Sequence, residues 1–115
     1  MVKTLSYREV KDISQRLAVS REDMRTILGI SESTQFGYEK KNPQLKPSIA
    51  DRFERFQRII NQALELYEDP EETQRWLSTP KDALDGEIPL KALATDRGTK
   101  KVEEMLYRAE YGIFG

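Results

Sequence analysis

The sequence predicts an all-α protein in which an N-terminal helix-turn-helix bundle is joined by a long helix to a small helical C-terminal part. Apolar residues recur at helical spacing along most of the 115-residue chain. Residues typical of helix ends, mainly Ser, Asp, Pro and Gly, separate these stretches. One apolar stripe continues from Ile49 to Tyr67. At about 1.5 Å per residue this helix is long enough to link both halves. We therefore expect it to be a shared spine.

The first two helices are predicted by their apolar spacing and their end residues. Val10, Ile13 and Leu17 fall on one face of a first helix. Ser20 has the residue type of an N-cap and begins the second helix. Gly29 ends that helix, since glycine adopts the left-handed conformation of a C-cap at little cost.

A short third helix follows after a single apolar residue. Ser31 is its expected N-cap, and we expect the helix to cover residues 32–40. Within it, we expect Phe36 to lie in the core. This compact spacing is typical of a helix-turn-helix, whose second helix presents side chains to a DNA groove.

The long central helix is expected to begin after a loop. Residues 41–47 contain Pro43 and Pro47, both unfavourable inside a helix. Ser48, with Asp51 three residues later, has the pattern of a capping box. The sequence therefore predicts a helix that starts at Ser48.

Three shorter helices are expected in the C-terminal half. Asp69 and Pro70 suit the N-cap and first position of one helix, and Pro89 begins a short one. Thr95 or Asp96 begins the last. Helix capping also explains the acidic residues around position 70, so we predict no metal site there.

The composition excludes several function classes. The chain has 0 Cys and 0 His, which removes thiol nucleophiles, imidazole bases and the commonest transition-metal ligands. We therefore expect no enzyme and no cofactor. Charged residues make up 34% of the chain, and no apolar run approaches the roughly 20 residues of a membrane span. These features predict a cytoplasmic protein without a membrane partner.

The net charge of −1 is unevenly distributed along the chain. Residues 1–58 carry 12 Lys and Arg against 8 Asp and Glu, a net charge of +4. Residues 59–115 carry 7 against 12, a net charge of −5. A basic half and an acidic half indicate surfaces for two different partners, with nucleic acid the natural partner of the basic one.

The third helix and the loop after it contain the candidate DNA-binding residues. Polar side chains here can bond base edges, and lysines can contact phosphates. The candidates are Ser31, Ser33, Thr34, Gln35, Tyr38, Lys40, Lys41 and Lys46. Glu32 and Glu39 count against DNA contact, because each places a carboxylate near phosphates. The alternative is a solvated helix in an ordinary helical bundle.

The C-terminal end and the single tryptophan are candidate interaction sites. Tyr111, Ile113 and Phe114 surround the predicted helix stop at Gly112. They either fold back onto the protein's own core or bind a partner. Trp76 is more typical of a core residue than of an interface hot spot. The residues alone leave the two interpretations of the C-terminal end open.

The second half resembles a known family. Its pattern is similar to the toxin-binding domain of Xre-type antitoxins, the MbcA/ParS/Xre family. The matching residues are Leu64-Glu65-Leu66-Tyr67, Asp69-Pro70-Glu71, Arg75-Trp76-Leu77-Ser78-Thr79-Pro80, Ala83-Leu84-Asp85-Gly86, Pro89-Leu90, Leu93-Ala94-Thr95, Gly98, Val102-Glu103, Leu106, Arg108 and Tyr111-Gly112-Ile113-Phe114. The first half, with its Leu28-Gly29-Ile30-Ser31 turn, is similar to the Xre-like helix-turn-helix domain.

The resemblance implies a bacterial type II antitoxin. Residues 1–58 would bind operator DNA, dimerise and repress the operon, and residues 59–115 would bind the toxin. The implied partner is a RES-domain toxin that consumes NAD+, held with an antitoxin homodimer in a larger complex. The family's C-terminal end covers the toxin's active site. This role would fall on Arg108, Tyr111, Gly112, Ile113, Phe114 and Gly115.

One departure from the family concerns the third helix. Residues 35–39 are less basic here than in many relatives, and Gly37 inside the helix costs about 1 kcal/mol relative to Ala. DNA binding would then be weak, depend on the toxin complex, or be absent. The alternative function is a repressor whose acidic C-terminal half only dimerises.

Overall fold

The computed structural model describes residues 5–112, which form seven α-helices and one short 3-10 helix. Within these residues the only extended pairing is a single bridge between Ser6 and Gln44. The predicted all-α class is confirmed. The elements are α1 (Tyr7–Arg16), α2 (Arg21–Leu28), α3 (Glu32–Lys41), α4 (Pro47–Tyr67), α5 (Pro70–Leu77), η1 (Asp82–Leu84), α6 (Pro89–Ala92) and α7 (Asp96–Glu110).

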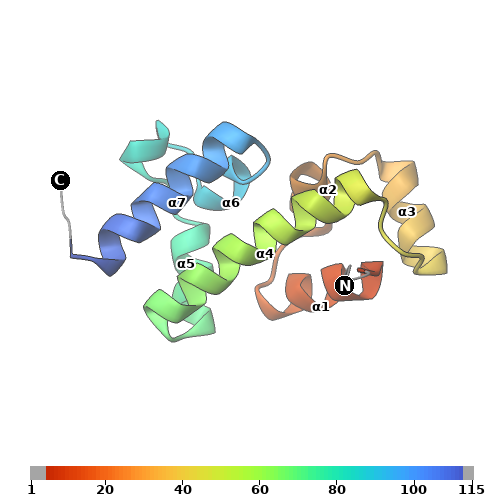
Figure 1. Ribbon diagram of the computed structural model, residues 1–115, viewed down its shortest axis with the longest axis horizontal. Coiled ribbons are helices and arrows are strands. Elements are labelled where there is room, and N and C mark those ends of the chain that lie inside the picture. The colour runs from red at the N-terminus through yellow and green to blue at the C-terminus, as the bar shows by residue number, and fades with distance from the viewer. Residues whose placement is uncertain (1–4, 113–115) are drawn as a thin grey trace.

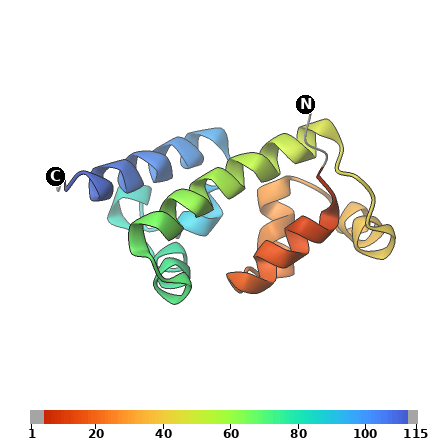
Figure 2. The ribbon, with the colours of Figure 1, turned by 60° about the horizontal axis from the view of Figure 1, so that its bottom comes forward.

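Helix α4 lies at the centre of the molecule, with the other helices packed around its two halves (Figure 1). The helices α1, α2 and α3 gather at its N-terminal half. The helices α5, α6 and α7 gather at its C-terminal half, and α7 runs beside it, as Figure 2 shows from a second direction. The result is an elongated molecule of 45 × 31 × 25 Å.

The core is continuous along α4. On α4 the side chains with at most 1% of their surface exposed are Phe53, Phe56, Ile59, Ile60 and Ala63. They belong to one hydrophobic cluster that includes buried residues of both halves. The expected boundary between residues 58 and 59 thus lies inside an unbroken helix. The spine role predicted for this helix agrees with the packing.

Most of the predicted helix ends are present. Ser20, Ser31, Asp69 and Thr95 each accept a hydrogen bond from a backbone N–H of the first helical turn, at 2.9 to 3.1 Å. Gly29 ends α2 with φ of +67°, in the left-handed region. These caps fix the direction in which α2, α3, α5 and α7 begin.

The start of α4 differs from the prediction. The helix begins at Pro47, and its N-cap is Lys46, whose side chain makes no capping hydrogen bond. The expected N-cap Ser48 is wrong. Proline suits the first helical position, because its φ is already helical and the missing N–H would lack an intrahelical partner there. Likewise α3 continues through Lys41, one residue beyond the expected end.

Two ion pairs join α4 to α7. Arg55 pairs with Asp96, and Arg58 Nε lies 3.6 Å from Glu103 Oε2. Gly98 near the start of α7 packs so closely on α6 that a Cβ atom there would collide with the carbonyl oxygen of Ala92. These contacts hold α7 against both neighbouring helices.

Trp76 packs at the edge of the core. Its ring centroid lies 6.0 Å from that of Tyr67, and both side chains are half-buried against the core cluster. The Lys81 ammonium lies over the indole, 5.2 Å from the ring centroid.

Between residues 5 and 112, no helix combines the length and the apolar character needed to cross a membrane.

Candidate functional site

The helices α2 and α3 form a helix-turn-helix held by local caps. Gly29 closes α2, Ile30 is half-buried in the turn, and Ser31 caps α3. The Ser31 hydroxyl accepts the N–H of Thr34 at 3.1 Å and donates to the Thr34 hydroxyl at 2.9 Å. Both side chains are exposed at the N-terminal end of α3, but they bond each other.

Gln35 is not placed for DNA contact, which corrects the sequence-based prediction. Its side chain is completely buried. The amide Nε2 donates to the Arg21 carbonyl oxygen at 2.8 Å, and Oε1 accepts from Arg25 Nη1 at 3.3 Å. Gln35 therefore fastens α3 to α2 in place of reading a base.

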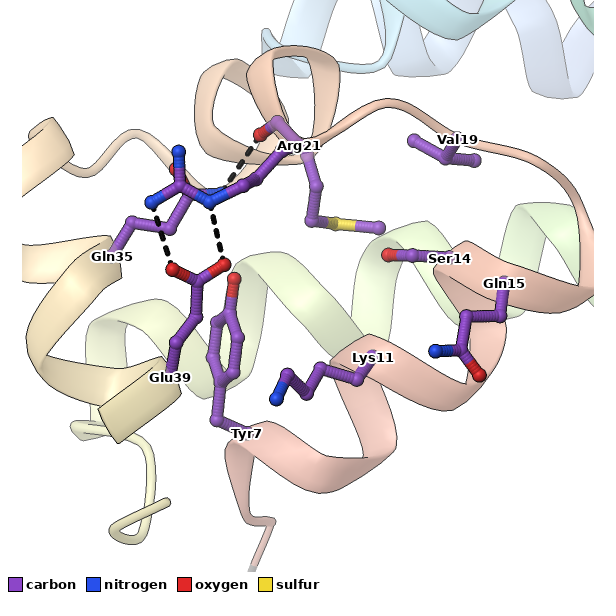
Figure 3. A pocket seen from close by; sticks show the side chains of 9 residues that line it. Tyr7, Lys11, Ser14, Gln15, Val19, Arg21, Gln35 and Glu39 are labelled. Carbon is purple, nitrogen blue, oxygen red and sulfur yellow. Dashed lines mark hydrogen bonds and ion pairs between the residues drawn. The ribbon is translucent and has the colours of Figure 1, made fainter. Parts of the chain in front are cut away.

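Beside Gln35, Arg21 and Glu39 form a bidentate ion pair between α2 and α3 (Figure 3). Both hydrogen bonds are 2.7 Å long. The bonds from Arg21, together with the nearby Lys11 ammonium, lower the pKa of the Glu39 carboxyl below its ordinary value. Because Arg21 neutralises it, Glu39 does not present the unpaired carboxylate that the sequence suggested.

The same side chains line a polar pocket between α1, α2 and α3. It has a volume of about 260 Å³, and Figure 3 shows Tyr7 and Lys11 of α1 facing the Arg21–Glu39 pair across it. Burial raises the pKa of the Tyr7 hydroxyl, so this group stays protonated at neutral pH. The pocket is therefore lined by the ion pair of α2 and α3 on one side and by polar side chains of α1 on the other.

Tyr38 is also buried, which is a second correction. Its ring stacks on that of Tyr7, with centroids 5.5 Å apart and planes 11° apart. Its hydroxyl oxygen accepts the backbone N–H of Lys46 at 3.3 Å. Tyr38 thus fixes the loop between α3 and α4 and cannot reach a base edge.

The outward face of α3 has an unexpected composition. Phe36, which we expected in the core, is 60% exposed there. Ser33 and Lys40 are exposed on the same face, and a Cβ at Gly37 would meet no atom within 4 Å. The surface that can approach a DNA groove is therefore formed by Ser33, Phe36, Gly37 and Lys40.

Three predicted phosphate contacts remain accessible beside this face. Lys40, Lys41 and Lys46 are exposed, and within residues 5–112 none has a carboxylate within ion-pair distance. A shallow groove of about 340 Å³ runs between Gly37 and Lys46. The lysines lie at the C-terminal end of α3 and in the loop after it.

At the opposite end of the molecule, the last turn of α7 exposes an aromatic pair. Tyr107 is 53% and Tyr111 is 62% exposed, and their ring centroids are 4.6 Å apart. Arg108 is exposed and donates to Glu104 at 2.7 Å. Gly112 follows with φ of +67°, in the left-handed region. The predicted residues Ile113, Phe114 and Gly115 lie outside the described residues.

Sequence reasoning missed Phe36 on α3 and Tyr107 on α7, although a signal existed for each. Phe36 and Tyr38 are two positions apart, so they cannot share a helix face, and only one of them could be buried there. Tyr107 and Tyr111 are four positions apart and share a face. Spacing could therefore have indicated both an exposed aromatic on α3 and a tyrosine pair on α7.

No group of residues suited to a metal appears among the described positions. Clusters of three or more acidic side chains able to hold an ion are absent from residues 5–112. Asp69 in the acidic run caps α5 by accepting the N–H of Glu71 at 3.0 Å.

The arrangement of the described residues favours two binding surfaces, a helix-turn-helix at one end and an exposed aromatic pair at the other.

Comparison with known proteins matches each half of the chain to a domain of one family. Residues 2–61 match the sequence model of the antitoxin Xre-like helix-turn-helix domain. Residues 62–112 match that of the antitoxin Xre/MbcA/ParS C-terminal toxin-binding domain. The chain is 36% identical over 73 residues to an antitoxin Xre of Pseudomonas putida, covering 64% of this chain and 46% of that protein.

A second relative is an antitoxin Xre of Yersinia enterocolitica, 32% identical over 69 residues, which covers 59% of this chain and 47% of that protein. These matches therefore cover about half the length of either relative. Together the two domain matches extend from residue 2 to residue 112. With its helix-turn-helix followed by a toxin-binding domain, the chain belongs to the family of Xre-type antitoxins.

Proposed function

We propose that this chain is the antitoxin of a type II toxin–antitoxin pair and the repressor of its own operon. Residues 59–115 would neutralise a RES-domain toxin that consumes NAD+, and residues 1–58 would bind operator DNA as a homodimer. The partner's identity comes from the family resemblance. The protein would act in the cytoplasm, as part of a larger toxin–antitoxin complex.

The exposed tyrosine pair at the end of α7 carries the toxin half of the proposal. Tyr107 and Tyr111 lie in the segment that matches a toxin-binding domain, and aromatic side chains are enriched at the centres of protein interfaces. The proposed toxin contact comprises Arg108, Tyr111, Gly112, Ile113, Phe114 and Gly115, with Tyr107 added. Covering an active site in this way requires shape and burial, and it requires no catalytic group.

The DNA half of the proposal is supported by the helix-turn-helix match and by the basic edge of α3. The accessible residues of the predicted set are Ser31, Ser33, Thr34, Lys40, Lys41 and Lys46. Lysines that contact phosphates release counterions, which makes DNA affinity fall with salt concentration.

The toxin half is tested in cells with the neighbouring reading frame under an inducible promoter of its own. Growth and NAD+ content are followed with the full chain, with a chain ending at residue 110, and with Phe36→Ala as a matched control at the other end. We expect the full chain and Phe36→Ala to restore NAD+, and the shortened chain to fail. Restoration by the shortened chain would refute the role of the C-terminal end.

A harmless neighbouring reading frame would favour the alternative function, a repressor whose acidic half only dimerises. The DNA half is tested separately by measuring affinity for the promoter fragment at several salt concentrations. We expect the logarithmic salt slope to decrease by close to 1 for each of Lys40, Lys41 and Lys46 replaced by Ala. A slope near zero for the unmodified chain would contradict phosphate contact.

A further inference from the structure

Phe36 is an unusual residue for an exposed position at the middle of α3. Three large hydrophobic side chains are well exposed within residues 5–112. Two of them, Tyr107 and Tyr111, lie together at the C-terminal end of α7, which is far from α3 in Figure 1. Phe36 is the third, and it stands alone, 60% exposed. The buried positions of α3 are taken by Gln35 and Tyr38, so rotation of the helix toward the core would expose those two side chains. Phe36 is therefore held outward by the packing of its neighbours.

The surroundings of Phe36 are polar and basic. Ser33 lies three positions before it and Lys40 four positions after it, which places both beside it on the helix surface. Lys41 and Lys46 border the shallow groove that Gly37 also lines. Centres of protein–protein interfaces are depleted in lysine, so a single ring among lysines fits a phosphate-rich partner better than a protein.

Because Gly37 has no side chain, the backbone of α3 is uncovered at the centre of this face. A Cβ atom there would meet nothing within 4 Å, so packing inside the protein does not require a glycine. Without a side chain at 37, the backbone of α3 can approach a partner closely, with Phe36 projecting beside it. The face thus combines one projecting apolar ring, a bare backbone and flanking cations.

We propose that Phe36 is a specificity-determining residue that recognises thymine by contact with its 5-methyl group in the major groove. The methyl group is the apolar feature by which this groove distinguishes thymine, and aromatic side chains contact it. Ser33 lies beside the ring to bond a neighbouring base edge, and Lys40, Lys41 and Lys46 contact phosphates. This inference rests on the operator binding proposed above.

The test removes the methyl group from the DNA. The promoter fragment bound by the full chain is first narrowed by footprinting, and each thymine in the footprint is then replaced in turn by deoxyuridine. We expect one thymine in each half-site to show an affinity loss of about fourfold, the value of one buried methyl group at roughly 0.8 kcal/mol. The other thymines serve as matched controls and should show no loss.

The complementary test changes the protein, by removing the ring in Phe36→Ala. This variant should bind thymine and uracil duplexes equally, whereas Phe36→Leu should keep part of the discrimination. Thermal melting of both variants checks that the fold is retained, and the uracil series with the unmodified chain tests the proposal even if a variant fails to fold.

The two proposals fail in different ways. If the full chain binds no promoter DNA at low salt, the proposed repressor function is refuted together with this inference. If it binds DNA but every deoxyuridine duplex binds as well as its parent, the thymine contact alone is wrong. A loss of dimer mass in Phe36→Ala with unchanged uracil sensitivity would instead assign Phe36 to a protein interface.

Discussion

Gly37 and Gly98 both lie inside helices, but their surroundings are opposite. A side chain at 37 would enter open space, whereas one at 98 would collide with the backbone of α6 at Ala92. Glycine in a helix interior, as at position 37, costs about 1 kcal/mol relative to Ala. Packing therefore decides whether an alanine substitution raises or lowers the free energy of unfolding at each position.

We expect Gly37→Ala to raise the free energy of unfolding by up to about 1 kcal/mol, because it removes the helix penalty and creates no collision. The same variant should bind promoter DNA more weakly, because the new methyl group fills the shallow centre of the α3 face. Gly98→Ala is the matched control and should lower the free energy of unfolding by about 1–3 kcal/mol. Urea denaturation measures both, and a destabilised Gly37→Ala would contradict the open position.

Gln35 provides a second prediction at the scale of one residue. Its amide bonds are buried, so Gln35→Ala leaves the Arg21 carbonyl group without its side-chain donor and opens a cavity. We expect a loss of about 1–3 kcal/mol in the free energy of unfolding. Ser33→Ala, on the exposed face, should stay within about 0.5 kcal/mol of the parent. Equal melting temperatures for both variants would contradict the structural role of Gln35.

At the scale of the element, α3 is the helix that sequence reasoning predicted least well. Its N-cap Ser31 was predictable, because a cap depends on residues within the next three positions. The burial of Gln35 and Tyr38 depends on the Arg21 carbonyl, 14 residues before Gln35, and on the Lys46 N–H, 8 residues after Tyr38. Such partners are set by tertiary packing, which local polarity does not reveal.

The C-terminal helices were more predictable. The α5 and α7 caps, the short α6 at Pro89 and the burial of Leu90 and Leu93 all follow from local residue types. The candidate C-terminal site was indicated by its apolar composition alone. That composition did not distinguish an exposed C-terminal end from a folded-back one. Of its large side chains the structure describes Tyr111, whose ring is exposed beside that of Tyr107.

The Arg21–Glu39 pair between α2 and α3 predicts a pH dependence of stability. The pKa of Glu39 is lowered in the folded state, so its ionisation stabilises the fold above the ordinary value of 4.5. This contribution is lost as the pH falls through the lower, folded-state pKa. We expect the unmodified chain to melt at a higher temperature than Glu39→Gln at pH 7. This difference in melting temperature should shrink below about pH 4.5. A difference that is constant down to pH 3 would contradict the ion pair.

At the scale of the whole molecule, the core along α4 joins the two ends that carry the proposed binding surfaces. Phe56 belongs to the same buried cluster as Leu28 of α2 and Leu106 of α7. The ion pairs of Arg55 and Arg58 with α7 add a polar connection at the surface. Such continuity predicts that the two halves fold as one cooperative unit.

We expect a single unfolding transition. Fluorescence of Trp76, which reports on the C-terminal half, and far-UV circular dichroism should give coincident denaturation curves. Phe56→Ala should shift both curves together, with a loss of about 3–5 kcal/mol. Separate midpoints for the two signals would show that residues 1–58 and 59–115 unfold independently.

The unbroken course of α4 has a further consequence for how the two ends interact. A helix of 21 residues is about 30 Å long, several times the Debye length of about 8 Å at physiological ionic strength. The phosphate charges of DNA bound at α3, as proposed above, would therefore be screened at the exposed end of α7. A partner bound at one end would affect binding at the other end through the partner's bulk, or through the number of chains that the partner holds together. The partner's charge would have no effect at that distance.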